Sequence, residues 1–282
     1  MLVRRRRIDQ AFGSLCLVAA VIAVTILFVL VGKLLADGAS RIRPEFFTSF
    51  PMPKPEEAGI LSSIAGSLWV MVLTLLITVP VGIAAAVYLE EFTTRKTRMT
   101  EFIQVNIANL SGVPSIVFGM LGLGVFVAVM DLKFSILAGA LTMSILVLPM
   151  VILVSQEALK AVPRSYREAS LAMGCTKWQA ITKVVVPNAM GGILTGVILA
   201  GSRAIGETAP LIVVGAVGYV NFLPKSVHDR YTVLPLQIFD WITRPAAGFK
   251  PLAAAAIIVL VLALLLLNSV AIFIRARSQS KA

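Results

Sequence analysis

Six long apolar runs restrict what this sequence of 282 residues can fold into. A helix needs about 20 mostly apolar residues to cross a bilayer, and each run is long enough. Five runs carry no charge, and the remaining one is interrupted only by Arg203 and Glu207. The runs cover residues 11–32, 58–89, 102–130, 134–156, 184–224 and 251–274. The sequence therefore predicts an all-α, polytopic membrane helix bundle with about six transmembrane helices.

The composition agrees with lipid as the main solvent of this chain. Apolar residues make up 58% of it and charged residues 14%, whereas a soluble domain is about half apolar and a quarter charged. The net charge of +11 could suggest nucleic acid as a partner. The basic residues, however, lie between apolar runs rather than along one face, which argues against a nucleic-acid partner.

The basic residues between the runs predict the orientation. With the amino terminus inside, the cytosolic segments carry fifteen Lys and Arg residues and the outer segments carry nine. The positive-inside rule therefore places both termini in the cytosol. Arg4 to Arg7 precede a first run that is too long for a signal peptide, so we expect a retained anchor.

These features divide the chain into five parts. We expect a basic cytosolic amino terminus at 1–10, a first transmembrane anchor at 11–32 and an outer loop at 33–60. A core of five transmembrane helices follows at 61–274, with a cytosolic loop at about 156–187. The cytosolic tail is 275–282.

The cytosolic loop between the fourth and fifth runs has the pattern of two short helices. Ser165 and Glu168 have the S-x-x-E spacing of a capping box, and Thr176 and Gln179 repeat it as T-x-x-Q. Gly174 between them can adopt the left-handed conformation that ends a helix. The sequence therefore predicts two helices that are broken at Gly174.

The first of these helices carries apolar side chains that no membrane span covers. They are Tyr166, Ala169, Leu171, Ala172 and Met173. An exposed apolar helix usually marks a docking surface. The alternative that the residues leave open is a helix that lies on the inner face of the membrane.

The loop also resembles the "EAA" loop of the permease subunits of bacterial ABC importers. Glu168, Ala169, Ser170 and Gly174, followed by Pro187, carry the resemblance, with Ser170 in place of the usual second alanine. The resemblance implies that the loop seats in a groove of a separate ATPase and transmits its closure to the channel. The residues assigned to ATPase coupling are Tyr166, Glu168, Ala169, Ser170, Gly174 and Pro187.

Arg203 and Glu207 lie within the fifth run, where charged residues are costly and usually face a cavity or a partner. Their i, i+4 spacing places them on one face of a helix. If this helix begins near Asn188, Arg203 lies about 22 Å along it at about 1.5 Å per residue. A guanidinium group donates two parallel hydrogen bonds to a phosphate or carboxylate, and a neighbouring glutamate would weaken its hold on an anion. A buried salt bridge that fixes the helix register is the structural alternative.

A row of small residues runs beside this pair at the same spacing. Its members are Gly192, Gly196, Ala200, Ala204 and Thr208. Such a row lets another helix approach closely.

Residues 202–211 resemble the fifth-span signature of phosphate permeases, and of the PstA family in particular, because Ala209, Pro210 and Leu211 follow the threonine. Segments 80–91 and 111–119 resemble the same family. The resemblance implies the MetI-like ABC permease fold and a multi-pass location in the bacterial cytoplasmic (inner) membrane. It also implies a substrate path that contains Arg203, Glu207 and, more weakly, Thr208.

The resemblance implies three kinds of partner: a PstC-like second permease subunit, a pair of PstB-like ATPase subunits and an extracytoplasmic, PstS-like phosphate-binding protein. The sequence contains no G-x-x-x-x-G-K-[ST] motif, so ATP is expected on the partner ATPase. His228 is the single histidine, Cys16 and Cys175 are isolated, and the acids are scattered. We therefore expect no metal, no cofactor on this chain and no catalytic residues.

The predicted function is that of a transmembrane permease subunit of an ATP-driven importer of inorganic phosphate. Another oxyanion, such as molybdate, sulfate or phosphonate, is the alternative within the same class. A secondary anion transporter is less favoured, because the sequence shows no second Arg–Glu string and no matching half. A membrane-embedded sensor or scaffold is a third possibility.

Overall fold

The computed structural model of this protein describes residues 2–93 and 97–279, and all regular elements within these ranges are helices. Five helical segments are long and apolar enough to cross a membrane, and a bent helix pair adds a sixth crossing if it counts as one. The prediction of an all-α membrane bundle with about six spans is confirmed. Arg95, Lys96 and Lys281, which the orientation argument uses, lie outside the described residues.

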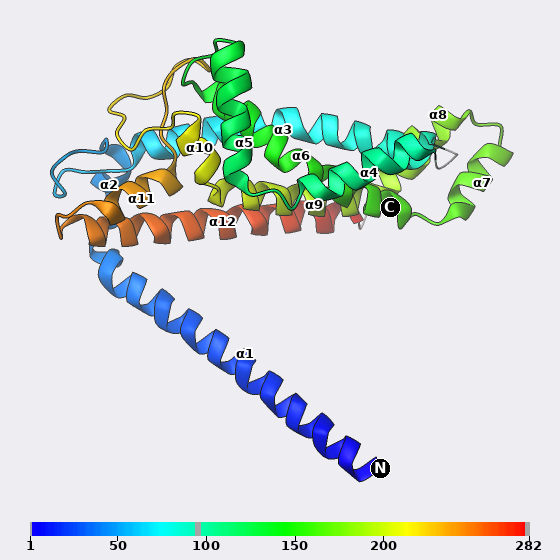
Figure 1. The fold of residues 1–282 in the computed structure, drawn as a ribbon, viewed down its shortest axis with the longest axis horizontal. Helices are drawn as coiled ribbons and strands as arrows, with labels where there is room; N and C mark the ends of the chain where they lie inside the picture. Colours follow the sequence, from blue (N-terminus) through cyan, green and yellow to red (C-terminus); the bar gives the residue numbers. More distant parts are fainter. Residues whose placement is uncertain (1, 94–96, 280–282) are drawn as a thin grey trace.

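Four long helices form the bundle in Figure 1, and a fifth, α1 (Leu2–Gly38), extends away from it. The four are α3 (Leu61–Val87), α6 (Ile136–Lys160), α9 (Val186–Gly206) and α12 (Phe249–Gln279). The helix of α3 continues into a π-helical turn, η2 (Tyr88–Phe92). The core packs around α6, which contacts α3, α9 and α5 (Ser115–Gly122).

The third predicted span consists of two helices that meet at an angle of 105°. The first is α4 (Arg98–Leu110), and the second is α5 with its π-helical continuation η3 (Leu123–Val129). Pro114 lies at the junction as the residue that precedes α5. Proline cannot donate a backbone hydrogen bond to the previous turn, so Pro114 accounts for the sharp bend.

The helix α1 contacts the bundle only near its carboxyl end, beside the start of α12 (Figure 1). None of the residues in its most apolar stretch of 18 residues is buried. A Cβ atom at Gly38 would lie 2.6 Å from the backbone nitrogen of Ala255. Only glycine allows this close approach, so Gly38 fixes the point at which α1 joins the bundle.

The end of the bundle that carries the start of α12 is covered by two short helices, α2 (Pro44–Thr48) and α11 (Leu234–Thr243). Trp241 of α11 is fully buried there. At the same end, the backbone N–H of Ile136 donates to the carbonyl of Asp229. The Asp229 carboxylate accepts hydrogen bonds from the backbone N–H groups of Lys225 and Ser226, and these hydrogen bonds lower its pKa.

Candidate functional site

The fifth span is a single helical segment from Lys177 to Gly206. It contains α8 (Lys177–Ala180), the π-helical turn η4 (Ile181–Val185) and α9. Glu207 has an extended backbone, and a separate short helix, α10 (Ala209–Val213), follows. The prediction that Arg203 and Glu207 lie on one face of a continuous helix is therefore wrong at Glu207, which lies just past the end of α9. Pro210 explains the break, because it cannot donate to the Gly206 carbonyl and its ring would clash with that carbonyl.

Arg203 and Glu207 remain close despite the break. The Nε atom of Arg203 lies 3.6 Å from Oε1 of Glu207, which makes an ion pair but is too long for a hydrogen bond. Within the described residues, no hydrogen bond engages the Arg203 guanidinium group. The Arg203 side chain is 51% exposed and that of Glu207 is 20% exposed. The arrangement leaves the planar face and donors of Arg203 available to an external group.

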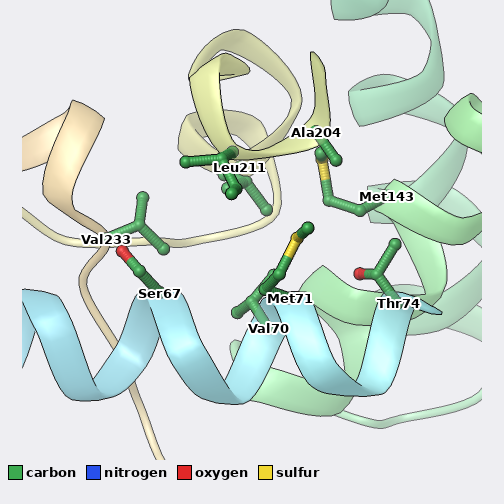
Figure 2. Close-up of a pocket in the computed structure, with 9 residues that line it drawn as sticks. Ser67, Val70, Met71, Thr74, Met143, Ala204, Leu211 and Val233 are labelled. Carbon is green, nitrogen blue, oxygen red and sulfur yellow. The ribbon is translucent and has the colours of Figure 1, made fainter. Parts of the chain in front are cut away.

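The opposite side of this helix end packs inside the bundle. Figure 2 shows Met71 and Thr74 of α3 and Met143 of α6 around Ala204. The cavity among them measures about 30 Å³, which is room for about one water molecule. The nearby Ser67 hydroxyl accepts a hydrogen bond from the backbone N–H of Leu234. Ala204 therefore faces the interior of the bundle, whereas the neighbouring Arg203 side chain is half exposed.

The small residues of α9 pack against α6, as their spacing predicts. A Cβ atom at Gly192 would lie 2.7 Å from Cβ of Ala158, and one at Gly196 would lie 2.6 Å from Cβ of Val154. Ala200 and Ala204 are buried. Thr208 does not continue this row, because it follows the break and precedes α10.

A polar contact that the sequence analysis missed lies one residue before Arg203. The Ser202 hydroxyl donates to Oδ1 of Asn268 in α12 at 2.5 Å, and a bond to the Ile198 carbonyl is also within reach at 2.9 Å. Asn268 is an amide within the otherwise apolar run of α12, and this exception could have drawn attention to it. The contact joins the end of α9 to α12 beside the charged pair.

The loop between the fourth and fifth spans forms the two helices that the sequence predicts. α7 (Arg164–Ala172) is followed by Gly174 with φ +84°, and α8 follows. Thr176 and Gln179 form the predicted capping box. The capping box predicted for Ser165 and Glu168 is wrong, because α7 begins at Arg164 after Pro163 and has no side-chain cap.

The apolar side chains of α7 are exposed, as expected for a docking surface. Tyr166 and Leu171 are about half exposed, and Met173, which directly follows α7, is 85% exposed. Glu168, Ala169 and Ala172 are exposed as well, whereas Ser170 is buried. Pro187 lies in the first turn of α9, directly after η4. Of the six coupling residues, three are thus exposed on α7 and one, Ser170, is buried on it. Gly174 lies in the turn after α7, and Pro187 is exposed in the first turn of α9.

The described residues contain no group of three or more His, Cys, Asp and Glu side chains that could hold a metal ion. The absence of a cofactor stays a prediction.

Comparison with known proteins places the chain in a family. The family model described as "Binding-protein-dependent transport system inner membrane component" matches residues 78–280. The phosphate transport system permease protein PstA of Xylella fastidiosa is 33% identical over 274 residues, which cover 96% of this chain and 94% of that protein. PstA 1 of Mycobacterium tuberculosis is 37% identical, with 73% of this chain and 67% of that protein covered.

Solved structures share the fold at low sequence identity. A bacterial ABC transporter involved in the import of the acidic polysaccharide alginate matches with a TM-score of 0.67 at 15% identity, over 93% of this chain and 95% of that one. The inward-facing MetNI methionine ABC transporter matches with a TM-score of 0.59 at 16% identity, over 78% of this chain and 94% of that one. These matches show the MetI-like permease fold, and with the family match over 78–280 they lead to one conclusion. This chain belongs to the family of binding-protein-dependent transport system inner membrane components.

Proposed function

We propose that this chain is a transmembrane permease subunit of an ATP-driven importer of inorganic phosphate. It is a multi-pass protein of the inner membrane, it forms half of the translocation path, and it couples to a separate ATPase through residues 165–187. The relatives named as phosphate transport permeases support phosphate as the substrate. The family supports a membrane subunit that itself carries out no catalysis.

The exposed guanidinium group of Arg203 carries the proposal. It extends from an apolar helix and uses none of its donors for hydrogen bonds within the described residues. A charge at such a position faces water or a partner rather than lipid, because its burial in hydrocarbon costs several kcal/mol. The guanidinium fork matches the oxygens of phosphate. Glu207 keeps Arg203 paired when no anion is bound and weakens the hold on the anion, so that the anion can leave.

The path requires a second subunit, because the Arg203 side chain is half exposed at the surface of this chain. We propose that a PstC-like permease subunit faces Arg203 and completes the path. A PstS-like binding protein would deliver phosphate at the end that carries α2 and α11. A pair of PstB-like ATPase subunits would receive the exposed apolar face of α7, and both termini of the chain would lie in the cytosol.

Replacement of Arg203 tests this function. The complete complex, reconstituted in vesicles, should take up labelled phosphate with ATP inside and the binding protein outside. The variant Arg203→Gln should reduce uptake at least about a hundredfold, as expected for the loss of a charge-assisted bidentate contact. The matched control is Lys160→Gln, because Lys160 also pairs with a nearby acid, Glu157, but lies at the end of α6 away from the proposed path. Normal uptake by the Arg203→Gln complex would show that the pair is structural.

Competition separates the alternatives. A guanidinium fork also accepts molybdate, sulfate or phosphonate, so each is tested as a competitor of phosphate uptake. Preference for one of them would replace phosphate as the substrate but keep the mechanism. Uptake by the purified chain without an ATPase would instead indicate a secondary transporter.

A further inference from the structure

The helix α7 is held to the bundle by little apolar contact. Ser170 is the buried residue of α7, and its hydroxyl donates to the carbonyl of Arg167 within the same helix. The apolar side chains of α7 face outward. The backbone joins α7 to the end of α6 through residues 161–163 and to α8 through residues 173–176. These covalent links reach α6 and the fifth span but not α3, so a movement of α7 reaches α3 directly only through a side-chain contact.

Arg167 provides such a contact through its pairing with Glu91 in η2. Its Nε donates to both carboxylate oxygens of Glu91, at 3.1 Å and 3.2 Å, and its Nη2 donates to Oε1 at 2.6 Å. The Glu91 side chain is 8% exposed and that of Arg167 is 23% exposed. This two-pronged ion pair fixes the direction of the guanidinium plane as well as its position.

The same guanidinium group also reaches the end of α6. Nη1 of Arg167 donates to the Val162 carbonyl at 2.6 Å, and Nη2 donates to the Leu159 carbonyl at 2.9 Å. A cavity of about 570 Å³ lies among η2, the end of α6 and α7, with Arg167 and Glu91 in its wall. One side chain therefore joins α7 to the ends of two spans at a place where packing between them is incomplete.

The residue after Glu91 contacts the second helix of the loop. The ring of Phe92 lies 6.1 Å from that of Trp178, and the Lys177 ammonium lies 5.2 Å from the centre of the Phe92 ring. Both Lys177 and Trp178 belong to α8. The turn η2, at the end of α3, is thus connected to α7 by Glu91 and to α8 by Phe92.

We propose that Arg167 and Glu91 are positioning residues that transmit the movement of α7 to α3 and α6. This inference rests on the proposed function, since it assigns the route by which an ATPase would act on the spans. The ion pair transmits a pull as well as a push, because its hydrogen bonds resist separation and rotation. A movement of the ATPase between two states would then move the spans as well, instead of changing only the conformation of the loop.

The test uses the complete reconstituted complex and measures phosphate taken up per ATP hydrolysed. The variant Glu91→Gln keeps the size of the side chain but removes its charge, and Arg167→Lys keeps the charge but removes the fork. Each should lower the ratio of uptake to hydrolysis about tenfold, a change within the range of coupling between sites. The ATPase subunits should still copurify with the chain. The double variant should be no worse than either single variant, because both remove the same contact.

The matched control is Lys160→Gln with Glu157→Gln. These two form an exposed ion pair at 2.9 Å near the same cavity, but they do not connect α7 to a span. The control should keep the wild-type ratio. An unchanged ratio in Glu91→Gln and Arg167→Lys would overturn the inference. Loss of assembly in both would overturn it too, because the pair would then serve folding. Absence of uptake by the wild-type complex would instead contradict the proposed function.

Discussion

Arg167 and Arg203 each lie beside a glutamate, but their guanidinium groups are used differently. Arg167 makes hydrogen bonds to Glu91 and to two backbone carbonyls and is mostly buried. Arg203 makes only a long ion pair with Glu207 and is half exposed. A salt bridge whose role is to fix structure resembles the first arrangement, because burial requires that the donors be satisfied. The contrast favours a role for Arg203 toward a group from outside the chain.

Glu207 should tune how tightly the anion is held. In Glu207→Gln, Arg203 loses its competing carboxylate, and the complex without its binding protein should bind phosphate about fivefold more tightly, the effect of about 1 kcal/mol for a partly exposed charge. Uptake should fall, because the anion leaves more slowly. Equilibrium binding of labelled phosphate and uptake into vesicles measure the two effects. Weaker binding in this variant would show that Glu207 does not oppose the anion.

Among the helices, the elements that the sequence predicts best are those set by apolar runs and by local hydrogen bonds. The six runs predict the spans, and the Thr176 and Gln179 spacing predicts the start of α8. The same reasoning fails at Ser165, because Pro163 fixes the backbone two residues earlier and α7 already begins at Arg164. A local pattern is therefore reliable only where no stronger constraint lies within the same turn.

The break at Glu207 and the contacts of the site could not be predicted in the same way. Apolar residues continue after Gly206, so hydropathy alone does not separate α9 from α10. Pro210 is a local sign of a helix break in this segment. The contact between Ser202 and Asn268 joins residues 66 positions apart, and the pair Arg167–Glu91 joins residues 76 apart. Their proximity depends on how α9 packs on α12 and how the loop folds back on α3. Periodicity within one segment contains no information about such packing.

Gly174 permits a direct test of the turn between α7 and α8. Its φ of +84° suits glycine, tolerates asparagine and strains a β-branched residue, whereas a Cβ atom there would meet nothing within 4 Å. Gly174→Val should therefore misplace α7 and lower phosphate uptake per ATP about tenfold, and Gly174→Asn should have a smaller effect. Both variants add atoms to open space, so the difference between them reports backbone conformation. Wild-type ratios in both variants would exclude this turn from coupling.

At the scale of the whole molecule, the chain leaves several functional surfaces uncovered. The span of α1 is unburied, the surface beside Arg203 is open, and the apolar side chains of α7 point away from the bundle. Lipid can cover the first of these surfaces. The second carries a charge that lipid does not solvate, and the third lies beyond the predicted spans. A chain with this distribution is suited to work within a larger assembly rather than alone.

The two ends of α6 give a prediction for the orientation of the molecule. Its last residue, Lys160, leads to α7, whereas Ile136 at its start is hydrogen-bonded to the loop that contains His228. These two ends of α6 lie about 36 Å apart at about 1.5 Å per residue. Because more basic residues flank the α7 end, Cys175 should react with a membrane-impermeant maleimide only in inside-out vesicles, in a Cys16→Ser background. The thiol introduced by His228→Cys, with both native cysteines replaced by serine, should react only in intact spheroplasts and serves as the matched control. Labelling of Cys175 from outside would show that the chain has the opposite orientation. No cytosolic ATPase could then reach α7.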